Sequence, residues 1–262
     1  MSRGGRAIVF VYLGTFFAFF TMLSGFLALA VARPFLGGGE VRQLLLSVLV
    51  AATVLTSLSF LYSGAAGPGG LSKAAARLGL GSQPVAFELL VASVGVLGAS
   101  FFLDGLIQRL GLSEVGTLAE LQRRLSDLPI SGKLVAAMAL GFFPGVGEEL
   151  FFRGYLLRRL AGLSGLTHAM LTSALAFGLF HLDPVQSPAA AVLGLYLGGV
   201  SILTGSLWAP ICAHAVNNAA ATLFTMIELE DGAARVLAIT GLVAAVSALF
   251  VLRQRRAVLP RL

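Results

Sequence analysis

The stretch AIVFVYLGTFFAFFTMLSGFLALAVA, from Ala7 to Ala32, contains no charged residue and follows Arg3 and Arg6. A helix needs about 20 mostly apolar residues to cross a membrane, and this stretch exceeds that length. The small residues at its end resemble a signal-peptide cleavage site, but the apolar region of a signal peptide is only about 7 to 15 residues long. The length therefore favours a retained first transmembrane helix over a cleaved leader.

The whole chain has this apolar character. Hydrophobic residues make up 57% of its 262 residues, charged residues make up 11%, and the mean hydropathy is +0.92. A soluble domain carries about 25% charged residues, so the composition predicts an all-α polytopic membrane protein with the lipid bilayer as a partner. We interpret residues 1–262 as one integral membrane domain, because no repeat or low-complexity segment divides them.

The formal net charge of +6 does not indicate nucleic-acid binding. The basic residues form short clusters between apolar runs, which is typical of loop charges that set membrane orientation. The single cysteine, Cys212, excludes an internal disulfide. Assigning the richer Lys and Arg loops to the cytoplasm predicts that both termini are cytoplasmic, and it places Glu148 to Arg159 toward the cytoplasmic half of the membrane.

About eight transmembrane helices are predicted from the apolar runs. They cover roughly residues 7–32, 44–62, 85–107, 134–152, 168–182, 188–209, 211–227 and 234–252. The fifth and seventh are short, and short membrane helices often mark a site or a cavity. Between the third and fourth, residues 113–127 place Leu118, Leu121 and Leu125 on one helical face, which predicts an amphipathic helix at the membrane surface.

The most informative polar residues lie inside these apolar runs. Glu148 and Glu149 end the predicted fourth helix, and adjacent helical residues point about 100° apart, so the two carboxylates face different surroundings. Glu149 and Arg153 are four residues apart and can form an ion pair on one face. That pairing leaves Glu148 to face a cavity, where it can act as a general base. Taken alone, this motif is better explained by two glutamates that pair with arginines at a helix end.

Two histidines and an asparagine complete the set. His181 ends the fifth predicted helix one turn after Phe177, and Asp183 either orients it or is a loop acid. His214 and Asn218 are four residues apart, so both project from one face of the seventh helix. Two N–H donors at this spacing can stabilise an oxyanion. Taken singly, each group is better explained as a polar clamp between helices.

The ordered set Glu-Glu-x-x-x-Arg, Phe-x-x-x-His and His-x-x-x-Asn resembles the CPBP intramembrane protease family, which includes type II CAAX prenyl endopeptidases and bacteriocin-processing or self-immunity proteins. The run Glu148-Glu149-Leu-Phe-Phe-Arg153-Gly-Tyr-Leu156 is especially similar to its first motif. The resemblance covers a catalytic core of about residues 133–227. It implies an intramembrane endopeptidase that acts on a membrane-anchored or C-terminally processed peptide or protein.

The resemblance also implies a role for each residue. Glu148 and His181 would activate water, His214 and Asn218 would hold the oxyanion, and the Glu149–Arg153 pair would support them. The family has also been described as metal-dependent, in which case Glu148, His181 and His214 would bind zinc. We favour water activation without a metal, because the chain has no His-Glu-x-x-His motif and asparagine is a poor zinc ligand.

Two other kinds of protein remain as alternatives. A non-catalytic membrane immunity or interaction protein could keep the polar cluster as a structural feature, although all four site residues are intact. A proton-coupled transporter could use glutamate and histidine as a relay, but transporters often consist of two matching halves, and none is evident here.

Overall fold

The computed structural model describes residues 3–36, 39–126, 128–224 and 231–258, and all regular structure in these ranges is helical, which confirms the all-α prediction. Asp127 of the predicted amphipathic segment and residues 225–227 of the predicted core lie outside the described residues. The elements in chain order are α1 (Arg3–Leu36), α2 (Glu40–Tyr62), α3 (Gly70–Leu78), α4 (Ala86–Arg109), α5 (Thr117–Ser126), α6 (Ile130–Glu149), the π-helix η1 (Leu150–Leu157), α7 (Arg158–Ser164), α8 (Leu166–Leu179), α9 (Gln186–Thr204), α10 (Trp208–Phe224) and α11 (Asp231–Val258).

Within the described ranges, six helical segments are long and apolar enough to cross a membrane. This result supports a multi-pass integral membrane protein, but it does not confirm the predicted count of eight. The two remaining candidates are α8, with 14 residues, and α10, with 17 residues. Both are shorter than the roughly 20 residues that span a hydrocarbon core. They are also the two helices associated with the motif histidines.

The fourth predicted helix is longer than its predicted extent of 134–152. Helix α6 continues through η1 and α7, so one helical segment runs from Ile130 to Ser164. It ends at Gly165, whose φ of 87° favours glycine. Glu148 and Glu149 end the α-helix α6, as predicted, but the helical segment does not stop there and continues through η1 and α7. They lie directly before the π-helix η1, all eight residues of which are buried. π-Helical turns inside α-helices are frequent at functional sites.

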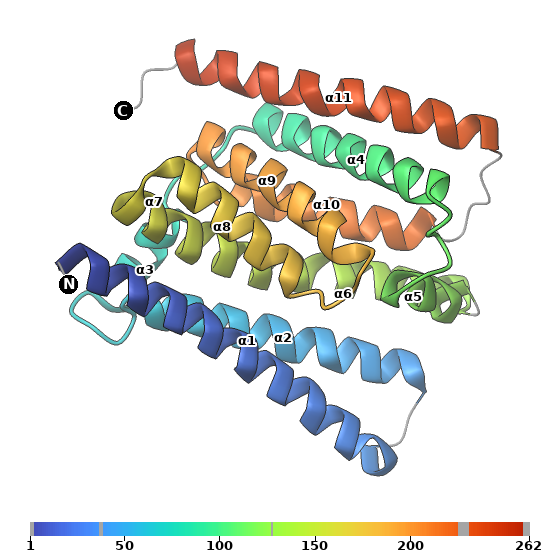
Figure 1. Ribbon diagram of the computed structural model, residues 1–262, viewed down its shortest axis with the longest axis horizontal. Coiled ribbons are helices and arrows are strands. Elements are labelled where there is room, and N and C mark those ends of the chain that lie inside the picture. The colour runs from blue at the N-terminus through green and yellow to red at the C-terminus, as the bar shows by residue number, and fades with distance from the viewer. Residues whose placement is uncertain (1–2, 37–38, 127, 225–230, 259–262) are drawn as a thin grey trace.

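The helices form a bundle whose two ends differ (Figure 1). Helix α1 begins and α11 finishes at the same end of the bundle, beside α3 and α7. We call this the terminal end. Helix α5 lies at the opposite end, near the start of α6, and we call this the distal end. The arrangement brings α6 between α2 and α10, which are distant from it in the sequence.

Glycines on α6 allow this close packing. A Cβ atom added at Gly141 would lie 2.8 Å from the carbonyl oxygen of Ala215 on α10, and one added at Gly145 would lie 2.9 Å from the Ala215 Cβ. On another face of α6, a Cβ at Gly147 would lie 2.7 Å from the Cα of Ala52 on α2. The small residues thus bring three backbones together around Glu148 and Glu149, as small residues do at membrane helix interfaces.

Helix α5 occupies most of the segment predicted to be amphipathic. Ala119 and Leu125 are buried, whereas the carboxylate of Glu120 accepts hydrogen bonds from Arg124 and Arg123 on the outer side. These hydrogen bonds, first that from Arg124, lower the pKa of the Glu120 carboxyl. The location of α5 at a membrane surface stays a prediction.

Candidate active site

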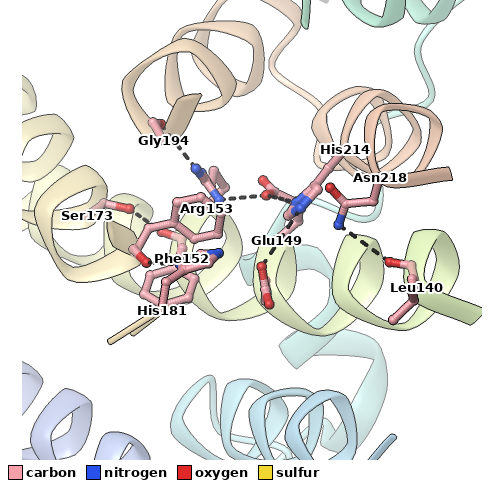
Figure 2. A network of polar contacts seen from close by, with 11 residues as sticks. Leu140, Glu149, Phe152, Arg153, Ser173, His181, Gly194, His214 and Asn218 are labelled. Atoms are coloured by element: carbon pink, nitrogen blue, oxygen red, sulfur yellow. Dashed lines mark hydrogen bonds and ion pairs between the residues drawn. The ribbon is translucent and has the colours of Figure 1, made fainter. Parts of the chain in front are cut away.

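The centre of the site is a buried ion pair between Glu149 and Arg153. Both side chains are fully buried, and Arg153 Nη1 donates to Glu149 Oε1, which confirms the predicted pairing. Arg153 Nη2 donates to the carbonyl oxygen of Gly194 on α9, at 3.1 Å. The guanidinium also lies over the ring of Phe177, 4.3 Å from its centroid. These contacts fix Arg153 between three helical segments and keep a counter-charge beside Glu149 (Figure 2).

Glu148 faces a different environment from its neighbour. Its side chain is 24% exposed, whereas that of Glu149 is 0% exposed. Glu148 and His181 both line a cavity of about 320 Å³. The other walls come mainly from apolar residues of α1 and α2, with Leu121 of α5 and Gln186 of α9. Glu148 is thus the carboxylate of the pair that solvent or a ligand can reach.

His214 connects the two glutamates. Its Nδ1 lies 2.8 Å from Glu149 Oε1, and its Nε2 lies 3.8 Å from Glu148 Oε2. Glu149 Oε1 accepts the hydrogen bond from Arg153 Nη1 and also faces His214 Nδ1, so the proton of a neutral His214 is on Nδ1. Its Nε2 then presents a lone pair toward Glu148. Figure 2 shows His214, Glu149 and Arg153 in one continuous chain of contacts.

His181 has the same tautomer for a different reason. It follows α8 and lies with Nδ1 2.9 Å from the carbonyl oxygen of Phe177. A carbonyl oxygen only accepts, so Nδ1 carries the proton and Nε2 of neutral His181 has the lone pair. The half-buried ring lines the cavity together with Glu148. The cavity therefore contains a carboxylate and an imidazole nitrogen, each able to accept a hydrogen bond.

Phe177 connects the two histidines, a role that only its position one turn before His181 could have suggested from the sequence. Its ring makes edge contacts with His181, at a centroid distance of 5.0 Å, and with His214, at 5.7 Å. Arg153 lies over the same ring. Phe177 is buried, so its ring is a fixed surface against which both imidazoles are oriented.

Asn218 is one turn from His214 and does not line the cavity with Glu148 and His181. Its Nδ2 donates to the carbonyl oxygen of Leu140 on α6, at 3.4 Å. This long bond is the interhelical contact expected of a polar clamp. Glu148 thus shares a cavity with His181 and lies near His214, while Asn218 lies at the edge of this group.

Asp183 caps a helix. Its Oδ1 accepts hydrogen bonds from the backbone N–H groups of Val185, at 2.8 Å, and Gln186, at 2.6 Å. These groups begin α9, so Asp183 stabilises the start of that helix. Leu182, between His181 and Asp183, has a φ of 51°, which a leucine rarely adopts. The turn that presents His181 is therefore held in an unusual conformation by the capped helix that follows it.

A shared metal ion requires three ligands close together. Both histidines present an unprotonated Nε2, as metal ligands do. However, among the described side chains no group of three or more His, Cys, Asp or Glu residues is placed to hold one ion. Glu148, His181 and His214 as arranged therefore do not fit a zinc site.

Residues 130–220 match the family described as type II CAAX prenyl endopeptidase Rce1-like. This segment begins with α6 and extends into α10, and it contains all six site residues. Searches of curated proteins and of solved structures returned no match. The match of residues 130–220 to an Rce1-like type II CAAX prenyl endopeptidase domain is consistent with the CPBP family that the motifs resemble.

Proposed function

We propose that this protein is an intramembrane endopeptidase in which Glu148 activates a water molecule. The family match supports a CAAX-type intramembrane protease. The observation that carries the proposal is that the two adjacent carboxylates have different surroundings. Glu149 is fully buried against Arg153 and His214, whereas Glu148 faces a cavity that it shares with His181.

The proposed reaction begins with a water molecule between Glu148 and His181. The water donates one hydrogen bond to the Glu148 carboxylate and the other to His181 Nε2. This orientation directs a lone pair of the water oxygen toward the peptide carbonyl carbon. Glu148 takes the proton as the C–O bond forms. It then returns the proton to the amide nitrogen as the C–N bond breaks. The products are a carboxylic acid and an amine.

His214 is proposed to stabilise the oxyanion of the tetrahedral intermediate. Since its Nδ1 proton is directed to Glu149, it can donate from Nε2 only after binding a second proton. Glu149, whose Oε1 lies 2.8 Å from Nδ1, holds the ring in place. Preorganised donors of this kind commonly make the largest contribution to acyl-transfer catalysis. Asn218 is the proposed second donor, and it would have to exchange its bond with Leu140 for one with the oxyanion.

We propose that the substrate is a membrane-anchored or C-terminally processed peptide or protein. To test this, purified protein in liposomes is incubated with lipid-anchored peptides, with and without a prenylated C-terminal cysteine motif, in H₂¹⁸O. The proposal expects two fragments with ¹⁸O in the new carboxyl group of one. If neither peptide type is cut by protein that is verified as folded, the proposed protease activity toward such substrates is wrong.

Replacing Asn218 by alanine tests the second donor. If Asn218 holds the oxyanion, kcat falls by about 10²–10³-fold, as for other lost oxyanion donors, while KM changes little. If Asn218 is only a clamp to Leu140, the melting temperature falls and the rate per folded molecule is retained.

Chelator treatment of the same sample tests the zinc alternative, because a zinc enzyme would lose activity and regain it on addition of zinc.

Replacing Phe177 tests its role as a positioning residue. Phe177→Leu keeps an apolar side chain but removes edge contacts worth about 0.5–1.5 kcal/mol each. We expect kcat to fall about tenfold, which corresponds to about 1.4 kcal/mol, with KM little changed and the pH profile of kcat shifted. Phe177→Tyr, which keeps the ring, should retain most of the activity. A lower melting temperature with unchanged kcat and pH profile would show a purely structural role.

A further inference from the structure

Ser173 is a buried polar residue to which the proposed mechanism gives no role. It lies on α8 and is 3% exposed, and its Oγ donates to the carbonyl oxygen of Phe152 in η1, at 2.8 Å (Figure 2). A serine inside a helix often bonds back to its own helix, as Ser59 does to the Leu55 carbonyl oxygen in α2. The Ser173 bond instead joins two helical segments through a backbone acceptor.

The acceptor belongs to the backbone of the π-helix η1, which directly follows Glu148 and Glu149. A carbonyl oxygen has two lone pairs, so that of Phe152 can accept the Ser173 hydrogen bond in addition to a bond within its own helix. π-Helical turns are rare, and their backbone hydrogen bonds differ from those of the α-helix around them. A directional bond from α8 therefore fixes where η1 lies along that helix.

Ser173 begins a row of three residues spaced by four on α8 and the turn after it: Ser173, Phe177 and His181. Residues at this spacing share one helical face. The Phe177 ring packs against the Phe152 ring, at a centroid distance of 5.2 Å, and His181 lines the cavity with Phe152 and Glu148. This face of α8 thus meets η1 at three levels. At the first level the contact is a hydrogen bond, which permits less sliding than the contact between rings.

We propose that Ser173 is a positioning residue of the hydrolysis. Its bond to Phe152 fixes the register between the segment that follows Glu148 and the helix that presents His181. The inference rests on the proposed protease function, in which the Glu148 and His181 side chains hold the water molecule. Ser173 is not among the described residues that line the cavity, so it acts through them. A slip of one residue along a helix is about 1.5 Å, which exceeds the range of distances over which a hydrogen bond forms.

A purely structural role for Ser173 is the alternative. Polar contacts between membrane helices contribute modestly to stability. A bond that only holds α8 against η1 would change the amount of folded protein and leave the rate of each folded molecule intact. Positioning changes that rate, because a misplacement of about 1 Å can cost about 10²-fold. The two roles are therefore separated by kcat per folded molecule and by a direct probe of His181.

The peptidase activity of the purified full chain in liposomes is compared for Ser173→Ala and for a matched control, Ser201→Ala. Ser201 of α9 is 1% exposed, and its Oγ has no hydrogen-bond partner among the described residues. The control thus removes a buried hydroxyl without breaking such a bond. We expect Ser173→Ala to lower kcat by about ten- to a hundredfold, with KM little changed. Ser201→Ala should keep kcat, and Ser173→Thr, which retains the hydroxyl, should keep most of it.

The three histidines of the chain give a readout that does not depend on cleavage. Protein labelled with ¹⁵N only in histidine shows the imidazole nitrogens of all three by NMR, and substitution of each histidine by glutamine assigns the signals. His168 lies near the start of α8, where its ring bonds to Ser164 and Tyr12, so it reports any general distortion of that helix. We expect Ser173→Ala to change the signals of His181 and to leave those of His168 unchanged.

An unchanged kcat or unchanged His181 signals in Ser173→Ala, or a loss of kcat that Ser201→Ala matches, would overturn the inference. If the alanine variant gives too little folded protein, Ser173→Cys repeats the test, because a thiol fills a similar space but donates only weakly. An unmodified protein that is folded but cuts no substrate refutes the protease proposal instead. The histidine signals then still show whether Ser173 fixes the position of His181.

Discussion

Replacing Glu148 by glutamine should abolish peptide-bond cleavage while the protein still folds. Glutamine keeps the shape of the side chain but cannot take a proton from water, and a general base contributes about 10²–10⁴-fold to a rate. Glu148 is partly exposed to the cavity, so the uncharged amide leaves no buried charge without a partner. We therefore expect kcat to fall at least that far, with a melting temperature close to that of the unmodified protein.

The matched control for this substitution is the adjacent residue. Glu149→Gln makes the same chemical change one position along, but it removes the carboxylate that pairs with Arg153 and His214. It should lower the melting temperature and the amount of folded protein. Full activity of purified Glu148→Gln in detergent or liposomes would refute the assignment of Glu148 as the base.

The second large effect is on stability. Arg153→Ala should strongly destabilise the protein, because removing one partner of a buried ion pair costs about 3–5 kcal/mol. The substitution leaves the carboxylate of Glu149 buried without its main counter-charge, removes the donor to the Gly194 carbonyl oxygen, and uncovers one face of Phe177. Thermal unfolding in detergent and the yield of folded protein measure the effect.

A double variant separates charge from packing at this position. Glu149→Gln with Arg153→Met replaces the buried pair by neutral side chains of similar size, and such replacements are often far less costly than removing one partner. We expect the double variant to melt at a higher temperature than Arg153→Ala. An Arg153→Ala protein that melts like the unmodified one would show that the pair contributes little to the fold.

Much of the helical architecture could be predicted from the apolar runs, because a membrane helix satisfies its own backbone and its length follows from the bilayer. The extent of the fourth helix could not be predicted in this way. The π-helix η1, which extends it, depends on the tertiary packing of its eight buried residues and leaves no periodic pattern in the sequence. The apolar runs did predict short fifth and seventh helices, and the corresponding α8 and α10 have 14 and 17 residues.

The site was predictable where it depends on local geometry. The Glu149–Arg153 pair follows from a spacing of four residues on one helix. The bond from His214 to Glu149 was not predictable, because it depends on how closely α10 approaches α6 through Gly145 and Gly141. The direction of Asn218 toward Leu140 depends on the same approach. The orientation of both histidines by Phe177 likewise arises only when α8, η1 and α10 meet.

The central claim is that Glu148 is the base of a membrane protease, and mass spectrometry of protein termini in native membranes tests it most directly. Cells that produce the unmodified protein are compared with cells that produce Glu148→Gln at the same level in the membrane. The account predicts new termini of membrane-anchored proteins in the first sample and their absence, with accumulation of the uncut proteins, in the second. The same set of termini in both samples would contradict it.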